Sequence, residues 1–252
     1  VNISCEASVG GGIPILMPLH QSLAANQIES IVGILNGTTN YILSQMTETG
    51  VNYANALADA QKQGFAEADP TNDVCGFDAA RKLAILSSIG FRANVTFDDV
   101  LVEGIEKIDK SDIQYAKDMG YTIKLLTVAL RQENGIALNV YPAFLPDNHP
   151  LSSVKGAYNA IYVTGNMVDD VMFYGRGAGA LPTASAVMGD VISTAQHILN
   201  GSTGTGMIMT DTKRIPFYSS LKLQNSYYFR LDVDDVTGLL SQIAAAFAEN
   251  DI

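Results

Sequence analysis

The residues best suited to chemistry lie close together, between positions 64 and 82 of this 252-residue chain. The charged side chains of this segment are, in order, Glu67, Asp69, Asp73, Asp78, Arg81 and Lys82. Carboxylates bind an ammonium group, and a lysine can give a proton to a carbonyl oxygen. The segment therefore predicts a site for a small zwitterion that also carries a carbonyl group.

Asp78 and Lys82 are four residues apart, so a helix would bring both side chains to one face. Surface pairs of this kind are common, and the alternative is an ordinary exposed ion pair. The surrounding helix, predicted over residues 74–88, is apolar nearly all round, which is typical of a buried helix. Buried charges are costly unless they are paired or used. The setting favours a functional pair, and Asp73 stands where it could cap this helix.

The elements that position these residues alternate irregularly between strands and helices. Strands are predicted over residues 30–35, 123–131, 136–143, 160–164 and 171–174. Further helices are predicted over residues 40–49, 53–63 and 182–199. Gly50, Gly64 and Gly90 are expected to end helices, and Asn134-Gly135 to turn a hairpin. This pattern predicts an α+β fold with a mixed β-sheet covered on one face by helices.

Both ends of the sequence suggest incomplete units. Val1 to Ile3 has the pattern of a strand without a preceding turn. Residues 227–233 alternate as a strand, and a helix is predicted over 239–249. A single strand and helix cannot bury their apolar faces alone. We therefore expect a second, incomplete domain from about Tyr227. Residues 202–206, rich in Gly, Ser and Thr, are predicted to form a mobile surface loop.

Composition excludes several classes of protein. The net charge of −11 argues against binding nucleic acid or an anionic membrane. The sequence contains no run of about eighteen apolar residues, which is the length that a membrane-spanning helix needs. The two cysteines, Cys5 and Cys75, form no CxxC pair, and the three histidines are scattered, so a zinc site or disulfide framework is not expected. Few cysteines and the lack of an export signal at Val1 predict a cytoplasmic protein.

The glycine segment 175–180 resembles a dinucleotide-binding loop, because it follows a predicted strand and precedes a predicted helix. A Rossmann loop also needs a second strand that ends in Asp or Glu about twenty residues later. That strand is missing here. We therefore do not interpret the segment as a Rossmann loop.

Three motifs together resemble homoserine dehydrogenases. The central one runs from Gly64-Phe65-Ala66-Glu67-Ala68-Asp69-Pro70 through Asp73, Gly76 and Asp78 to Ala80-Arg81-Lys82. The others are residues 6–15, Glu-Ala-Ser-Val-Gly-Gly-Gly-Ile-Pro-Ile, and residues 33–43, Gly-Ile-Leu-Asn-Gly-Thr-Thr-Asn-Tyr-Ile-Leu. The likeness extends from about Glu6 to Leu199. It implies a fold like the C-terminal domain of glyceraldehyde-3-phosphate dehydrogenase-type enzymes.

The resemblance implies a role for each of several residues. Lys82 is the expected catalytic acid, and Asp78 is expected to position it and to bind substrate. Glu67 and Asp73 are the further substrate-binding residues. Gly64, Gly177 and Gly179 are expected to contact the NAD or NADP cofactor. A sodium ion is implied at four main-chain oxygens, those of Glu6, Val9, Gly11 and Ile13; glycines let such carbonyls converge on a hard cation.

The resemblance also implies boundaries. Residues 1–220 correspond to the catalytic and dimerisation domain, and residues 227–252 to the start of an ACT regulatory domain. The family's N-terminal NAD(P)-binding domain, with its second conserved lysine, has no counterpart in this sequence. Residues 1–252 alone are therefore expected to be inactive, and a homodimer is expected because one sheet face lacks helices.

The expected reaction is the reversible reduction of L-aspartate 4-semialdehyde to L-homoserine, a step towards threonine, methionine and isoleucine. One alternative is a non-catalytic amino-acid sensor. Another is aspartate-semialdehyde dehydrogenase, which uses a cysteine nucleophile. Neither Cys5 nor Cys75 has a histidine nearby in the sequence, which disfavours that enzyme.

Overall fold

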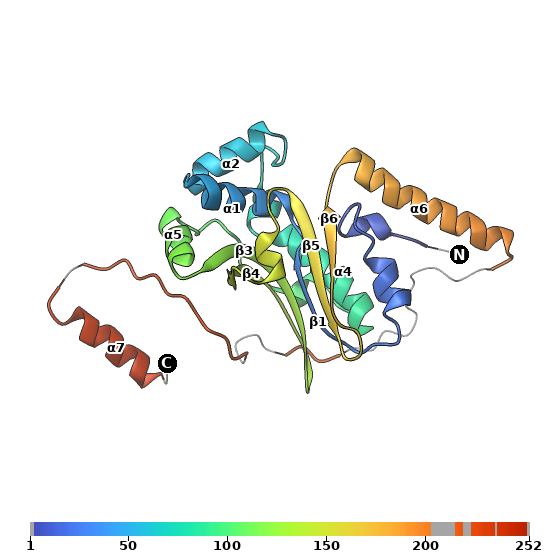
Figure 1. Cartoon of the computed structure of the whole chain (residues 1–252). Coiled ribbons are helices and arrows are strands. Elements are labelled where there is room, and N and C mark those ends of the chain that lie inside the picture. Colours follow the sequence, from blue (N-terminus) through green and yellow to red (C-terminus); the bar gives the residue numbers. More distant parts are fainter. Residues whose placement is uncertain (1–2, 203–214, 219–222, 235, 251–252) are drawn as a thin grey trace.

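The computed structural model describes residues 3–202, 215–218, 223–234 and 236–250. Its centre is one six-stranded sheet with the order β2-β4-β3-β1-β5-β6 (Figure 1). The strands are β1 (Ile28–Ile34), β2 (Leu101–Val102), β3 (Tyr121–Gln132), β4 (Gly135–Pro146), β5 (Tyr158–Gly165) and β6 (Asp169–Arg176). Neighbouring strands are antiparallel except β2 and β4, which are parallel. The predicted mixed sheet is confirmed.

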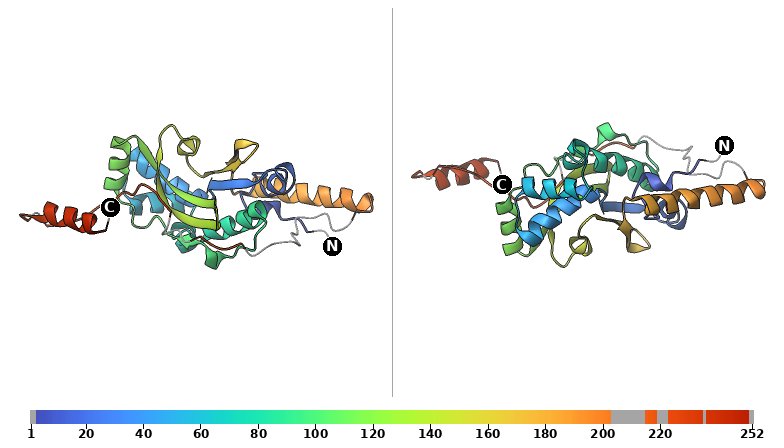
Figure 2. Two further views of the ribbon diagram at one scale, coloured as in Figure 1. Left: turned by 90° about the horizontal axis from the view of Figure 1, so that it is seen from below. Right: turned by 90° about the horizontal axis from the view of Figure 1, so that it is seen from above.

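The helices are α1 (Gly37–Thr49), α2 (Tyr53–Lys62), α3 (Thr71–Val74), α4 (Phe77–Phe91), α5 (Lys110–Asp118), α6 (Ala180–Leu199) and α7 (Leu239–Glu249). The shorter helices among the described residues are η1 (Glu6–Ser8), η2 (Pro18–Ser22), η3 (Phe97–Asp99) and η4 (Pro150–Ser153). Figure 2 shows α6 (orange) extending beyond the sheet on the side opposite to α7 (red). No helix in the described part of the chain is both long enough and apolar enough to cross a membrane.

The main core lies between one face of the sheet and the helices α1 and α4. Alternating residues of β1 face opposite sides, because side chains on a strand alternate. Ile31 joins the main core together with Leu43 of α1 and Leu83 of α4. Ile34 instead joins a smaller cluster around η4 on the other face. The helices thus cover one face, as the sequence predicts.

The hairpin of β3 and β4 confirms the predicted turn, but its centre lies one residue earlier. Gln132 pairs with Gly135, so the two turn residues are Glu133 and Asn134. A Cβ on Gly135 would lie 2.2 Å from the carbonyl oxygen of Pro216. The glycine is therefore needed because another backbone segment passes against it.

The single helix predicted over residues 74–88 is wrong. It is divided into α3 and α4 by Gly76, whose φ is +82°. A Cβ on Gly76 would meet the side chains of Val102 and Val140 at 3.1 Å. The predicted stop at Gly90 is also wrong, since α4 continues to Phe91. Gly90 instead allows close packing, because its Cβ would lie 2.7 Å from Ile31.

The predicted strand over 227–233 does not form, although α7 forms over the predicted residues 239–249. The segment finds no strand partner among the described residues and is held by side chains instead. Tyr228 donates to Asp112 at 2.9 Å, and Arg230 pairs with the same carboxylate. At the other end Ile3 is not in a strand. Val1, Asn2 and residues 203–206, of the predicted loop, lie outside the described residues.

Candidate active site

The Asp78–Lys82 pair forms in α4, directly beneath the end of β1. The ammonium of Lys82 donates to Oδ2 of Asp78 at 2.7 Å and to the carbonyl oxygen of Leu35 at 3.0 Å. The side chains of Lys82 and Asp78 are 21% and 31% exposed. The pair is thus neither a free surface pair nor fully buried. A small molecule can reach it while the surrounding protein holds its geometry.

Asn36, the residue before α1, links this pair to Asp73. Its Nδ2 donates to Oδ1 of Asp73 at 2.7 Å and to Oδ2 of Asp78 at 2.9 Å. Its Oδ1 accepts from the backbone N–H of Thr39 at 2.9 Å and so caps α1. In the sequence, Asn36 could be identified only as part of the motif over residues 33–43. Its position before a helix has the signature of a cap and gives no sign of the two carboxylates.

The predicted capping role of Asp73 is wrong. Asp73 lies inside α3, and Gly76 occupies the N-cap position of α4 without a side-chain cap. The extra turn at Gly76 changes the direction of the chain, and the Asp73 carboxylate turns to Asn36. Asp73 and Asp78 therefore meet at one amide group, which joins two of the predicted substrate-binding residues.

The loop after α2 carries the other predicted residues, Gly64 and Glu67. Gly64 adopts a φ of +78° after the end of α2, as predicted, and no atom lies within 4 Å of the position of an added Cβ. The next carbonyl, of Phe65, accepts from the hydroxyl of Thr38 at 2.6 Å. This bond ties the acidic loop to the start of α1, beside Asn36. The side chain of Glu67 is exposed in this loop.

The aromatic ring of Phe65 anchors the same loop. It lies 4.6 Å, between ring centroids, from Tyr41 of α1. The Tyr41 hydroxyl donates to Asp59 of α2 at 2.5 Å, and this bond raises the pKa of Tyr41 to about 12. The tyrosine stays a neutral donor at physiological pH. Helices α1 and α2 and the loop are thereby fixed to one another.

Sheet topology brings the glycine loop after β6 to the same end of the molecule. Strands β1 and β6 both run antiparallel to β5, which lies between them, so they run parallel to each other. Their carboxyl ends meet at one edge. Two inter-strand spacings amount to about 10 Å, the expected separation of the chain at Asn36 from that at Gly177. A small substrate or a nicotinamide ring fits a distance of this size.

Gly177 is held between two other segments. A Cβ on Gly177 would lie 2.1 Å from Nδ2 of Asn159, and one on Gly11 would lie 2.4 Å from the Gly177 carbonyl oxygen. Asn159 is buried, and neither polar atom of its side chain has a hydrogen-bond partner among the described residues. Gly179 has a φ of +122° and precedes α6. Only glycine permits the backbones to approach so closely. We call Gly11, Gly177 and Gly179 together the glycine corner.

The predicted sodium segment forms a turn through Gly10 and Gly11, with φ values of +75° and +55°. The carboxylate of Glu6 accepts from the N–H groups of Ile15, Leu16 and Met17, so this side chain caps the start of the following helical turns. Within the described residues, no cluster of three or more His, Cys, Asp or Glu side chains could hold a metal. Any cation here would depend on main-chain oxygens.

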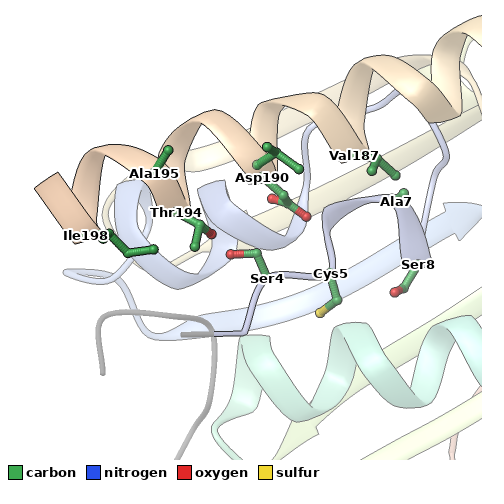
Figure 3. Close-up of a pocket in the computed structure, with 10 residues that line it drawn as sticks. Ser4, Cys5, Ala7, Ser8, Val187, Asp190, Thr194, Ala195 and Ile198 are labelled. Atoms are coloured by element: carbon green, nitrogen blue, oxygen red, sulfur yellow. The ribbon is translucent and has the colours of Figure 1, made fainter. Parts of the chain in front are cut away.

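A groove lies between η1 and α6, and its lining does not include Lys82, Asp78 or Glu67 (Figure 3). Its lining consists of Ser4, Cys5, Ala7, Ser8, Val187, Asp190, Val191, Thr194, Ala195 and Ile198. Burial raises the pKa of the Cys5 thiol, and burial likewise raises that of Cys75. A cysteine nucleophile needs the opposite shift, towards the thiolate. The two thiols therefore do not support cysteine-based dehydrogenase chemistry.

Comparison with known proteins agrees with the motifs. The homoserine dehydrogenase family profile matches residues 14–192. Curated homoserine dehydrogenases from Corynebacterium glutamicum and Bacillus subtilis are 45% and 43% identical over the whole chain. The chain spans 57% and 58% of their lengths.

Solved structures give the same result. A homoserine dehydrogenase from Thiobacillus denitrificans superimposes with a TM-score of 0.89 and 39% identity, covering 97% of this chain and 57% of that one. A hyperthermophilic archaeal homoserine dehydrogenase mutant in complex with NADPH has a TM-score of 0.65 and 28% identity, covering 76% and 55%. Fold, motifs and relatives agree, and the chain belongs to the homoserine dehydrogenase family.

Proposed function

We propose that this chain is the catalytic part of an oxidoreductase that interconverts L-homoserine and L-aspartate 4-semialdehyde with NAD(P)(H). The observation that carries the proposal is the Lys82 ammonium, held at 2.7 Å from Asp78 at the end of β1. Lysine offers three N–H donors. Two are used by Asp78 and Leu35. The third is available for a substrate oxygen.

In the reduction, Lys82 gives a proton to the aldehyde oxygen as negative charge grows there. Asp78 keeps the ammonium in place through their 2.7 Å hydrogen bond. The carboxylates of Glu67 and Asp73 bind the substrate's ammonium group by charge-assisted hydrogen bonds. In the reverse direction Lys82 takes the proton from the hydroxyl of homoserine. The bound cofactor supplies or accepts the hydride.

Three observations support a nicotinamide site beside Lys82. Gly64 presents open backbone with no atom where a side chain would stand. Gly177 and Gly179 follow β6, at the sheet edge where β1 also ends, and strand spacing puts the chain at Gly177 about 10 Å from that at Asn36. Asn159 keeps an amide without a protein partner among the described residues, directly beneath Gly177. We propose these glycines as cofactor contacts, with NADP or NAD as the cofactor.

We also propose a sodium ion at the main-chain oxygens of Glu6, Val9, Gly11 and Ile13. Within the described residues, no backbone hydrogen bond outside helices and strands ends on the last three of these oxygens. Oxygen ligands suit a hard monovalent cation. The ion would fix the turn that supports Gly177, because Gly11 lies against that residue.

The proposed organisation assigns residues 1–220 to a catalytic and dimerisation domain and residues 227–252 to the start of an ACT domain. The homodimer proposal is supported by the sheet face opposite α1 and α4. Tyr174 and Met172 of β6 are 55% and 37% exposed. A biosynthetic role in threonine, methionine and isoleucine formation, in the cytoplasm, completes the proposal.

The test is Lys82→Ala in the enzyme at the full length of its relatives. Homoserine oxidation is followed by the absorbance of the reduced cofactor. We expect kcat to fall by about two to four orders of magnitude, the usual size of a general-acid contribution, with KM much less affected. The matched control is Lys107→Ala, an exposed lysine. Near-normal turnover by Lys82→Ala would show that Lys82 is not the general acid.

A further inference from the structure

We infer that Asn36 is a positioning residue for the reaction, and that its amide N–H donors, not its capping oxygen, serve catalysis. The inference rests on the proposed function. Asn36 is 5% exposed, so its bonds are shielded from competing water. One nitrogen donates to Asp73 at 2.7 Å and to Asp78 at 2.9 Å.

The neutral amide separates two carboxylates that would otherwise face each other. Both accept from the same nitrogen, so the accepting oxygens lie within about 6 Å of one another, twice a hydrogen-bond length. Like charges at this distance repel. A neutral group with two donors holds both carboxylates in place without adding charge. No other common side chain of this size combines two donors with a capping oxygen.

The effect reaches Lys82 through a shared oxygen. Oδ2 of Asp78 accepts from Asn36 and from Lys82. Asn36 thus fixes the orientation of the carboxylate that aims the ammonium. The main chain of Leu35, the preceding residue, accepts from the same ammonium. The end of β1 therefore controls two of the lysine's three donors, and through them the direction of the third.

The capping function and the donor function can be separated by substitution. Asp caps helices about as well as Asn, and Asn36→Asp keeps the oxygen that accepts from Thr39. It removes both N–H donors and places a third carboxylate beside Asp73 and Asp78. If Asn36 acts only as a cap, Asn36→Asp changes kcat through its added charge alone, and a neutral capping residue at this position leaves kcat unchanged.

Asn52 supplies a matched control. It is the N-cap of α2, and its Oδ1 accepts from Asn55 at 2.9 Å, the same distance as the Asn36–Thr39 bond. Its side chain is exposed, and no hydrogen bond among the described residues joins it to a carboxylate. Asn52→Asp therefore repeats the chemical change at a position with the cap alone.

The experiment measures kcat and KM for homoserine in the full-length enzyme and in both variants, with far-UV circular dichroism as a folding check. We expect Asn36→Asp to lower kcat by about 30- to 100-fold, the order of loss that a displacement of 1 Å can cause. The KM for homoserine should change less than kcat. Asn52→Asp should match the unsubstituted enzyme.

Asn36→Ser guards against a charge effect or a folding failure. Serine also caps helices, carries no charge, and is too short to reach both carboxylates. The inference expects the same loss of kcat. A crystal structure of this variant should show the Lys82–Asp78 distance lengthened from 2.7 Å. Retention of kcat within about threefold by folded Asn36→Ser or Asn36→Asp overturns the inference. Failure of the unsubstituted enzyme to oxidise homoserine instead overturns the proposed function.

Discussion

Lys124, on β3, allows a prediction of stability against pH. It is 2% exposed, and its ammonium donates to Oδ1 of Asn40 at 3.0 Å and to the carbonyl oxygen of Val154 at 2.5 Å. None of the ion pairs formed by the described residues includes it. Burial is the main reason why its pKa falls from 10.5 to about 8. The folded protein therefore holds a costly charge at neutral pH.

The magnitude follows from linkage. The two pKa values differ by about 2.5, and each pH unit corresponds to about 1.4 kcal/mol, so the charged lysine costs roughly 3 to 4 kcal/mol well below pH 8. Between the folded and unfolded pKa values the unfolded chain binds more protons. The free energy of unfolding therefore rises with pH in this window. About 2 to 3 kcal/mol should be recovered between pH 7 and pH 10.

The assay is urea unfolding at several pH values, followed by far-UV circular dichroism, for the protein and for Lys124→Met. Tyr41, Tyr53 and Tyr228 have pKa values raised to about 12, so they reduce stability above pH 10 in both proteins. Comparing the two proteins cancels this effect.

The stability of the unsubstituted protein relative to Lys124→Met should increase by about 2 to 3 kcal/mol from pH 7 to pH 10. Lys117→Met, at an exposed lysine of α5, should show no such trend. A difference between the protein and Lys124→Met that does not change with pH would refute the reasoning.

Two further predictions concern the glycine corner and assembly. Gly177→Ala places a Cβ 2.1 Å from the Asn159 amide, and should destabilise by about 1 to 3 kcal/mol. Adding Asn159→Ala should restore most of this loss, and simple additivity of the two effects in urea unfolding would contradict the contact. The protein should sediment as a homodimer at micromolar concentration, with an interface on the sheet face opposite α1 and α4; a monomer under these conditions argues against it.

Features that depend only on neighbouring residues could be predicted from the amino-acid sequence. Gly50 and Gly64 take positive φ values just beyond α1 and α2, and Asp78 meets Lys82 one turn later. The β3–β4 hairpin forms at the predicted turn, with its centre one residue before Asn134-Gly135. These features follow from backbone preference and from the periodicity of helix and strand, which a short segment carries with it. The family motifs added the expected roles of individual residues.

Contacts between segments that lie far apart in the sequence could not be predicted in this way. The helix predicted over 74–88 breaks at Gly76, which has a φ of +82° and stands where a Cβ would lie 3.1 Å from side chains of β2 and β4. The segment 227–233 stays out of the sheet, and its Tyr228 and Arg230 side chains bond to Asp112 instead. Asn36 reaches Asp73 and Asp78 across 37 and 42 residues of chain. Such contacts depend on the order of the strands in the sheet and on which backbone segments approach closely. The local preference of a segment for helix or strand determines neither.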